Sequence, residues 1–264
     1  MKLFFQKSGD GDAVIILHGL LGSGDNWIGV ARKLAEHYNV YLVDIRNHGR
    51  SPHDDVHTYM SIVEDINELM QLCNLRRVHL VGHSMGGKAA MLYSNLFIEK
   101  IITLSVIDIA PDGYKIITDK QQPHDSNLNI LNAMLNVGLS KVSSRTEVDK
   151  LLSVSIPDLI VRQFIMKNLN RNSYNIFNWK PNIQVLINFL PEIMGPLNLR
   201  ESDKFPVLFL KGEYSNYLAG KHLQSVSDFY PYAKINIVNN AGHWIHADQP
   251  DLLINALFQH FNSA

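Results

Sequence analysis

Runs of apolar residues recur along the chain, and most of them are continuous rather than alternating with polar residues. Continuous apolarity predicts strands that are covered on both faces, which is typical of a parallel sheet. Between these runs, apolar residues at helical spacing predict helices. The strands are expected at residues 13–17, 40–43, 78–81, 101–107, 207–210 and 235–238, and the helices at 26–37, 58–73, 87–96 and 250–261.

The alternation of strands and helices stops after residue 111 and resumes at residue 205. The intervening pattern is mainly helical and is interrupted by Pro and Asn. Its helices are expected at residues 127–137, 145–152, 157–168 and 183–189. We therefore expect a mostly parallel, doubly wound α/β sheet domain, formed by residues 1–111 and 205–264, with residues 112–204 inserted as a helical cap.

Composition and charge argue against several classes of function. Lys and Arg number 24 against 25 Asp and Glu, a net charge of -1, which gives no electrostatic reason to expect nucleic acid. The sequence contains no run of about 18 apolar residues, so no membrane span is predicted. The first polar residues come too early in residues 1–7 for a signal peptide. The single cysteine, Cys73, lies in a helical pattern and is expected to be a buried structural thiol. These features predict a cytoplasmic protein and leave its oligomeric state open.

A G-x-S-x-G motif occupies residues 82–86, directly after the apolar run 78–81 and directly before a helix-forming stretch. A turn between strand and helix is where an enzyme can hold a serine hydroxyl exposed and reactive. Gly82 and Gly86 leave room for close approach of the backbone, and the turn is expected to strain Ser84. Ser84 is therefore the candidate nucleophile.

A serine nucleophile needs a histidine base, which can come from a distant part of the chain. His243 follows the last predicted strand, on the edge of the sheet where Ser84 is also expected. The chain has 12 histidines, but the order of nucleophile first and histidine last, each just past a strand, favours His243.

An oxyanion formed by attack of Ser84 needs two backbone N–H donors. The residue after the nucleophile, Met85, supplies the first. The loop H-G-L-L-G-S at residues 18–23 follows a predicted strand and is expected to supply the second from Leu20. His18 is expected to support this loop. Neither a G-x-x-x-x-G-K-[ST] nor a G-x-G-x-x-G phosphate-binding motif is completed here.

Five motifs spread over almost the whole chain carry a family resemblance: residues 18–23, V-D-I-R-N-H-G-R-S-P at 43–52, G-H-S-M-G-G-K at 82–88, I-D-I-A-P at 107–111 and G-H-W-I-H-A-D at 242–248. They resemble the α/β-hydrolase superfamily, and more narrowly its small bacterial esterase branch related to the abhydrolase-domain 11 proteins. The R-N-H-G-x-S and H-S-M-G-G-K strings are fairly specific to this branch. The resemblance is weakest in the cap. It implies the α/β-hydrolase fold, with no cofactor and no metal.

The resemblance leaves two candidates for the acid that orients the histidine. In most α/β-hydrolases the acid lies three residues after the glycine matched here by Gly212, but that position is Ser215, which carries no charge. Glu213 is a nearby carboxylate. Asp108, at the carboxyl end of the fourth predicted strand, is where the resembling esterases are expected to place their acid. We favour Asp108 over Glu213, with Ser215 as an auxiliary hydrogen-bond partner of His243.

The remaining distinctive residues are expected to have supporting roles. Lys88, one helical turn after Ser84, should pair with a carboxylate or support a loop, and Asn47 and His48 should stabilise the loop that borders the site. Three aromatic residues of the cap are candidates for an acyl pocket: Tyr174, Phe177 and Trp179.

The leading hypothesis is a serine carboxylic-ester hydrolase that acts on short to medium acyl esters through an acyl-enzyme. Its partner would be a small-molecule ester or thioester, because an acyl-CoA thioesterase can use the same acyl-enzyme. Haloalkane and epoxide hydrolases of this fold carry an acid at the nucleophile position, which is Ser84 here. A ligand receptor with slow turnover, or a silent scaffold, is the alternative from another class. Rapid turnover of p-nitrophenyl esters would separate the enzyme from the receptor.

Overall fold

The computed structural model describes residues 1–116, 127–174, 176–202 and 204–263. Within these residues the chain forms a seven-stranded sheet with the strand order β1-β3-β2-β4-β5-β8-β9. All neighbouring strands pair in parallel except β1 and β3, which are antiparallel. The strands are β1 (Phe5–Ser8), β2 (Ala13–Leu17), β3 (Asn39–Val43), β4 (Val78–His83), β5 (Ile101–Ile107), β8 (Val207–Gly212) and β9 (Lys234–Val238).

Each predicted strand is present, and the mostly parallel sheet is confirmed. The sequence analysis missed β1, which is short and half-exposed and whose side chains do not form an apolar run. It was also wrong to expect β9 to be covered on both faces. Because β9 is an edge strand, four of its five residues are exposed, including Ile237 at 61%.

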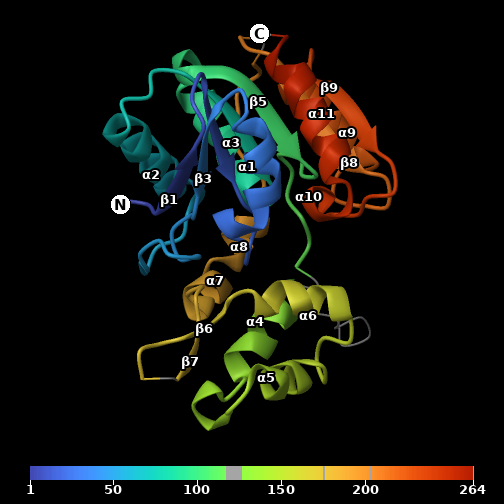
Figure 1. Cartoon of the computed structure of the whole chain (residues 1–264). Coiled ribbons are helices and arrows are strands. Elements are labelled where there is room, and N and C mark those ends of the chain that lie inside the picture. Colours follow the sequence, from blue (N-terminus) through green and yellow to red (C-terminus); the bar gives the residue numbers. More distant parts are fainter. Residues whose placement is uncertain (117–126, 175, 203, 264) are drawn as a thin grey trace.

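Helices cover both faces of the sheet, as expected for a doubly wound fold (Figure 1). Alternate side chains of each strand point to opposite faces, so Val14 and Ile16 pack with one set of helices and Ile15 and Leu17 with the other. The first set consists of α1 (Ile28–Leu34), α10 (Ile245–Asp248) and α11 (Pro250–Phe261). The second set consists of α2 (Tyr59–Leu72), α3 (Met85–Leu96) and α9 (Lys221–Phe229).

The described chain also contains three single-turn 3-10 helices, which are η1 (Gly24–Trp27), η2 (Ile98–Lys100) and η3 (Leu139–Lys141). Cys73 directly follows α2 and is half-buried rather than fully buried. No helix within the described residues is long and apolar enough to cross a membrane.

Between β5 and β8 the chain leaves the sheet and forms a separate group of elements beside it (Figure 1). We call residues 112–204 the cap segment. Each of the four predicted helices of the cap segment has a counterpart, but the sequence analysis missed the hairpin of β6 and β7 and the short helix α8. The elements are α4 (Asn127–Asn136), α5 (Arg145–Leu152), α6 (Leu159–Met166), β6 (Leu169–Arg171), β7 (Phe177–Trp179), α7 (Ile183–Asn188) and α8 (Leu190–Met194).

The two connections between the sheet and the cap segment run side by side. Tyr114 N donates to Met194 O at 2.7 Å, and Leu197 N donates to Pro111 O at 2.8 Å. We call this pair of hydrogen-bonded connections the neck. The buried ammonium of Lys88 on α3 donates to the carbonyl oxygens of Asp112, at 2.6 Å, and Gly195. Lys88 therefore supports both sides of the neck, which agrees with the loop-supporting role expected from the sequence. Burial lowers the pKa of its ammonium group to about 7.

Candidate active site

Ser84 occupies the sharp turn between β4 and α3. Its backbone has φ 52° and ψ -119°, a conformation that is strained for any residue with a Cβ. A Cβ on Gly82 would lie 2.3 Å from Gly86 O, and one on Gly86 would lie 2.5 Å from His18 O. Both glycines are therefore required by the tight packing of this turn. Ser84 lines a cavity between the sheet and the cap segment.

His243 lies on the loop after β9 and lines the same cavity as Ser84. Its Nδ1 is 2.7 Å from Oδ2 of Asp108, a fully buried carboxylate directly after β5. Because a carboxylate only accepts hydrogen bonds, the contact places the ring proton on Nδ1 and leaves the Nε2 lone pair available as a base. The structure thus brings together Asp108 and His243 as the sequence predicts.

Glu213 and Ser215, the other two candidates near the later strand, have different positions. Glu213 is exposed, and its Oε2 accepts from Asn240 N at 2.8 Å. Ser215 donates its Oγ–H to Asp108 Oδ2. It therefore supports the acid, whereas the sequence analysis expected it to bond His243 directly. Asp108 Oδ1 also accepts from Gly212 N at 3.1 Å. Asp108 is therefore fixed from two sides before it contacts the imidazole.

Two further aromatic residues hold His243, and the sequence analysis identified neither. The ring of Tyr217 stacks on the His243 ring, with centroids 4.0 Å apart and planes 22° apart. His83, the residue before the nucleophile, donates from Nε2 to His243 O at 2.8 Å. Because burial lowers the pKa of His83 well below its ordinary value, this side chain stays neutral. The backbone and the ring of His243 are thus both restrained.

The loop that carries Leu20 is a tight turn beside Ser84. Gly19 O accepts from His18 Nδ1 at 2.8 Å and from Gly22 N at 2.9 Å. In a trans peptide the N–H points opposite to the carbonyl, so these bonds direct the Leu20 N–H away from the interior of the turn. A Cβ on Gly19 would lie 3.1 Å from the Cβ of Ser84, which places this peptide against the nucleophile. Leu20 and Met85 both line the cavity.

Two buried neutral histidines join this turn to the loop after β3. His18 uses Nδ1 to donate to Gly19 O, so its Nε2 accepts from Ile45 N at 3.0 Å. His48 donates from Nδ1 to Arg46 O at 3.0 Å and accepts at Nε2 from Leu21 N at 3.1 Å. The expected loop-supporting roles of His18 and His48 agree with these contacts. Burial lowers the pKa of His18 to about 4 and that of His48 to about 3.

These lowered pKa values predict acid sensitivity of the fold. Between pH 6.5 and about 3 the unfolded chain binds a proton at residue 48 that the folded chain does not bind, so stability falls as the pH falls through this range. His48→Gln should therefore make the pH dependence of the unfolding free energy shallower, by an amount that approaches about 1.4 kcal/mol per pH unit as the pH falls below 6. Urea unfolding at pH 7, 6 and 5 measures this slope. An unchanged slope in the variant would contradict the argument.

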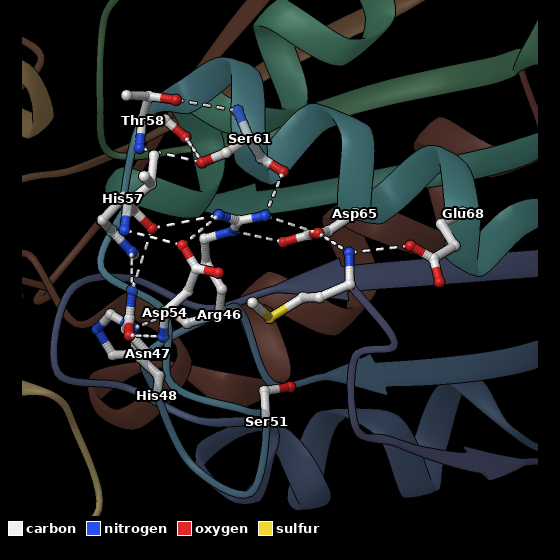
Figure 2. A network of polar contacts seen from close by, with 12 residues as sticks. Arg46, Asn47, His48, Ser51, Asp54, His57, Thr58, Ser61, Asp65 and Glu68 are labelled. Carbon is white, nitrogen blue, oxygen red and sulfur yellow. Dashed lines mark hydrogen bonds and ion pairs between the residues drawn. The ribbon is translucent and has the colours of Figure 1, made fainter.

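A polar network holds the loop that carries His48 (Figure 2). Arg46 forms two hydrogen bonds with the buried Asp65 of α2, at 2.6 and 2.8 Å, and its guanidinium also donates to Val56 O and Ser61 O. Asn47 is buried and donates to the same Val56 carbonyl at 3.3 Å. The paired hydrogen bonds fix the guanidinium in one plane, and the loop-stabilising role expected for Asn47 fits its contacts.

The cavity beside Ser84 has a volume of about 500 Å³. The sheet domain contributes polar groups that include Ser84 and His243, and the cap segment adds Asn127 and Asp158. The cap segment contributes a wall that is mostly apolar: Ile130, Val161, Phe164, Ile165, Ile193 and Met194. The sequence analysis did not single out these residues, since apolar positions at helical spacing do not reveal which of them face a cavity.

The aromatic residues expected to form the acyl pocket lie elsewhere. Phe177 and Trp179 are not among the described residues that line the cavity, because β7 turns them into the packing of the cap segment itself. Trp179 donates its indole N–H to Met134 O at 2.9 Å, and Phe177 packs beneath the Arg171 guanidinium at 4.3 Å. Tyr174 is 83% exposed. The expected pocket role of Phe177 and Trp179 is corrected to one in packing.

No group of three or more His, Cys, Asp or Glu side chains that could hold a metal ion is found among the described residues. The cavity is lined by a strained serine hydroxyl and by an imidazole that a buried carboxylate orients, next to the turn that carries the Leu20 N–H.

Comparison with known proteins defines the class to which this fold and site belong. Residues 12–250 match the family model described as the alpha/beta hydrolase fold. The chain therefore belongs to the alpha/beta hydrolase family, and the predicted fold class is confirmed.

Individual relatives are similar over nearly the whole chain. Esterase YbfF of Escherichia coli is 31% identical over 257 residues, which are 97% of this chain and 96% of that protein. The sn-1-specific diacylglycerol lipase ABHD11 of Mus musculus is 35% identical over 258 residues, 94% of this chain and 81% of that protein. A solved structure described as a marine microorganism esterase is 39% identical, with a TM-score of 0.93, and the match covers 98% of this chain and 99% of that one. The predicted resemblance to esterases and abhydrolase-domain 11 proteins is confirmed.

Proposed function

We propose that the protein is a serine carboxylic-ester hydrolase that acts on short to medium acyl esters through an acyl-enzyme. The observation that carries this proposal is the 2.7 Å contact of the buried Asp108 with His243, which lines the same cavity as the strained Ser84. The esterases and lipases among the relatives support the same class of substrate.

The proposed reaction uses these residues in turn. His243 Nε2 takes the proton of Ser84 as its Oγ attacks the ester carbonyl. The N–H groups of Leu20 and Met85 stabilise the oxyanion, and Asp108 stabilises the imidazolium. His243 then gives its proton to the leaving alcohol as the acyl C–O bond breaks. A water molecule, activated in the same way, attacks the acyl-enzyme and releases the acid with Ser84 restored.

The cavity supports an acyl substrate of limited size. Its volume lies within the range of about 300–1,000 Å³ that is usual for small-molecule sites. Ser84 and His243 line the cavity together with the mostly apolar wall from the cap segment, which suits an alkyl chain. A hydrolysis screen with p-nitrophenyl esters from acetate to decanoate, alongside the corresponding acyl-CoAs, tests the proposal. Hydrolysis of the CoA thioesters with no turnover of any ester would contradict it.

Phe164 should influence the choice among acyl lengths. It lies on α6, lines the cavity and packs on Trp244, with ring centroids 5.1 Å apart. Phe164→Ala should change the ratio of kcat/KM for decanoate over acetate by about tenfold, because a pocket discriminates by roughly 1–3 kcal/mol per methylene.

Trp179→Ala is the matched control, since it removes an aromatic side chain of the cap segment that does not line the cavity. This variant should lower stability by about 3 kcal/mol and leave the ratio unchanged. Steady-state kinetics on both esters, with urea unfolding, measures the two effects. Equal losses on both esters in Phe164→Ala would show that Phe164 only packs the cap segment.

A further inference from the structure

Leu21, in the turn next to Leu20, is held at both of its backbone polar groups by buried side chains. It has φ 59°, a left-handed conformation that is unusual for leucine, and only 5% of its surface is exposed. Its N–H donates to His48 Nε2 at 3.1 Å, and its carbonyl accepts from Asn168 Nδ2 at 2.8 Å. Such a strained conformation persists only where the surroundings hold it in place.

Asn168 belongs to the cap segment, whereas His48 belongs to the sheet domain. Asn168 is 3% exposed and lies between α6 and β6. Its backbone N–H donates to Ile165 O at 2.9 Å, and its carbonyl accepts from Lys180 N at 3.0 Å. The side-chain amide is therefore presented to Leu21 from a backbone fixed at both ends.

Two peptide planes connect this contact to the proposed oxyanion donor. Leu21 O, held by Asn168, belongs to the same peptide as Gly22 N, which donates to Gly19 O at 2.9 Å. Gly19 O in turn belongs to the same peptide as the N–H of Leu20. Because each peptide is planar, a rotation of the Leu21–Gly22 peptide weakens the hydrogen bond from Gly22 N to Gly19 O. That bond orients the Gly19–Leu20 peptide.

We infer that Asn168 is a positioning residue through which the cap segment orients the Leu20 N–H for the oxyanion. The inference rests on the proposed function for its catalytic consequence, and on the hydrogen bonds above for its structural part. It assigns the cap segment a role in the chemical step, in addition to its contribution to the wall of the cavity.

Asn168→Ala and Asn168→Asp test the inference, because both remove the donor and the aspartate keeps the shape of the side chain. Direct loss of an oxyanion donor costs about 10²–10³ in kcat, so loss of its orientation should lower kcat by about tenfold to a hundredfold. KM should change by less than about twofold. Binding of a trifluoromethyl ketone, whose adduct with Ser84 mimics the tetrahedral oxyanion, should weaken by the same factor as kcat/KM.

Asn95→Asp provides a matched control. Asn95 lies on α3, and its amide also joins the sheet domain to the cap segment, where it donates to Arg200 O at 2.8 Å and accepts from Arg200 N at 3.1 Å. These contacts do not involve the turn that carries Leu20, so this variant should keep wild-type kcat. If Asn168→Ala and Asn95→Asp have the same kcat, or if the Asn168 variants change only KM and thermal stability with kcat unchanged, the inference is overturned.

Amide hydrogen exchange of residues 18–24, followed by mass spectrometry, gives a readout that does not depend on turnover. Exchange should become faster in both Asn168 variants and stay unchanged in Asn95→Asp. A wild-type protein that hydrolyses no ester and takes no fluorophosphonate would overturn the proposed function. In that case faster exchange in Asn168→Ala still supports the structural part of the inference, that Asn168 holds the turn in place. Unchanged exchange overturns that part.

Discussion

Ser84→Ala should lower kcat on p-nitrophenyl acetate by about 10⁶-fold, because the alanine removes the atom that forms the acyl-enzyme. A fluorophosphonate should label the wild-type chain at the peptide that contains Ser84 and should leave the variant unlabelled. Stopped assays at high enzyme concentration measure the residual rate, and mass spectrometry of the digested protein locates the label. Circular dichroism verifies that the variant is folded.

Ser94→Ala is a suitable control, since Ser94 is a buried serine on the same helix, α3, whose hydroxyl donates to Met91 O. This variant should keep both the label and the activity. A label on another serine, together with full activity of Ser84→Ala, would show that Ser84 is not the nucleophile.

Asp108→Asn should lower kcat by up to about 10⁴-fold with the fold intact. The asparagine carbonyl can still accept from Gly212 N, while its amide would donate to His243 Nδ1. That donation forces the imidazole proton onto Nε2, so the ring can no longer take the proton of Ser84. Steady-state kinetics and urea unfolding of the variant measure the two properties separately.

Glu213→Gln and Ser215→Ala are the comparisons that make the Asp108 result specific. The Glu213 carboxylate accepts a hydrogen bond from the Asn240 backbone, and Ser215 acts on the acid rather than on the imidazole. Both variants should lose far less activity than Asp108→Asn. If Glu213→Gln is the inactive variant and Asp108→Asn is nearly as active as the wild type, the acid has been assigned wrongly.

The sheet was predictable because its central strands are buried on both faces and therefore read as continuous apolar runs. The elements that the sequence did not reveal lack that signal. Strand β1 lies at one edge and is half-exposed, and the β6–β7 hairpin has strands of three residues each. Strand β9 was found from its isoleucines, but its exposure depends on its edge position, which composition does not encode.

The common location of Ser84, His243 and Asp108 was predictable because each follows a strand in a short motif, and parallel strands bring such ends to one edge. The supporting contacts depend on three-dimensional packing. Tyr217 stacks on His243 although it lies in an irregular loop, and Asn168 reaches Leu21 from 147 positions away in the chain. Phe177 and Trp179 were chosen as large aromatics in the cap, but their strand points them into its interior.

The neck that Lys88 supports also bears on how the chain reaches its folded state. Strands β5 and β8 are neighbours in the sheet although the whole cap segment separates them in the sequence. Closing a loop costs more conformational entropy as the loop lengthens, by about 0.6 kcal/mol for each doubling. Because the neck brings Pro111 and Leu197 within hydrogen-bonding distance, a cap segment that folds first reduces this long loop to a short connection. Pairing of β5 with β8 then becomes, in effect, a local contact, and local contacts form faster during folding.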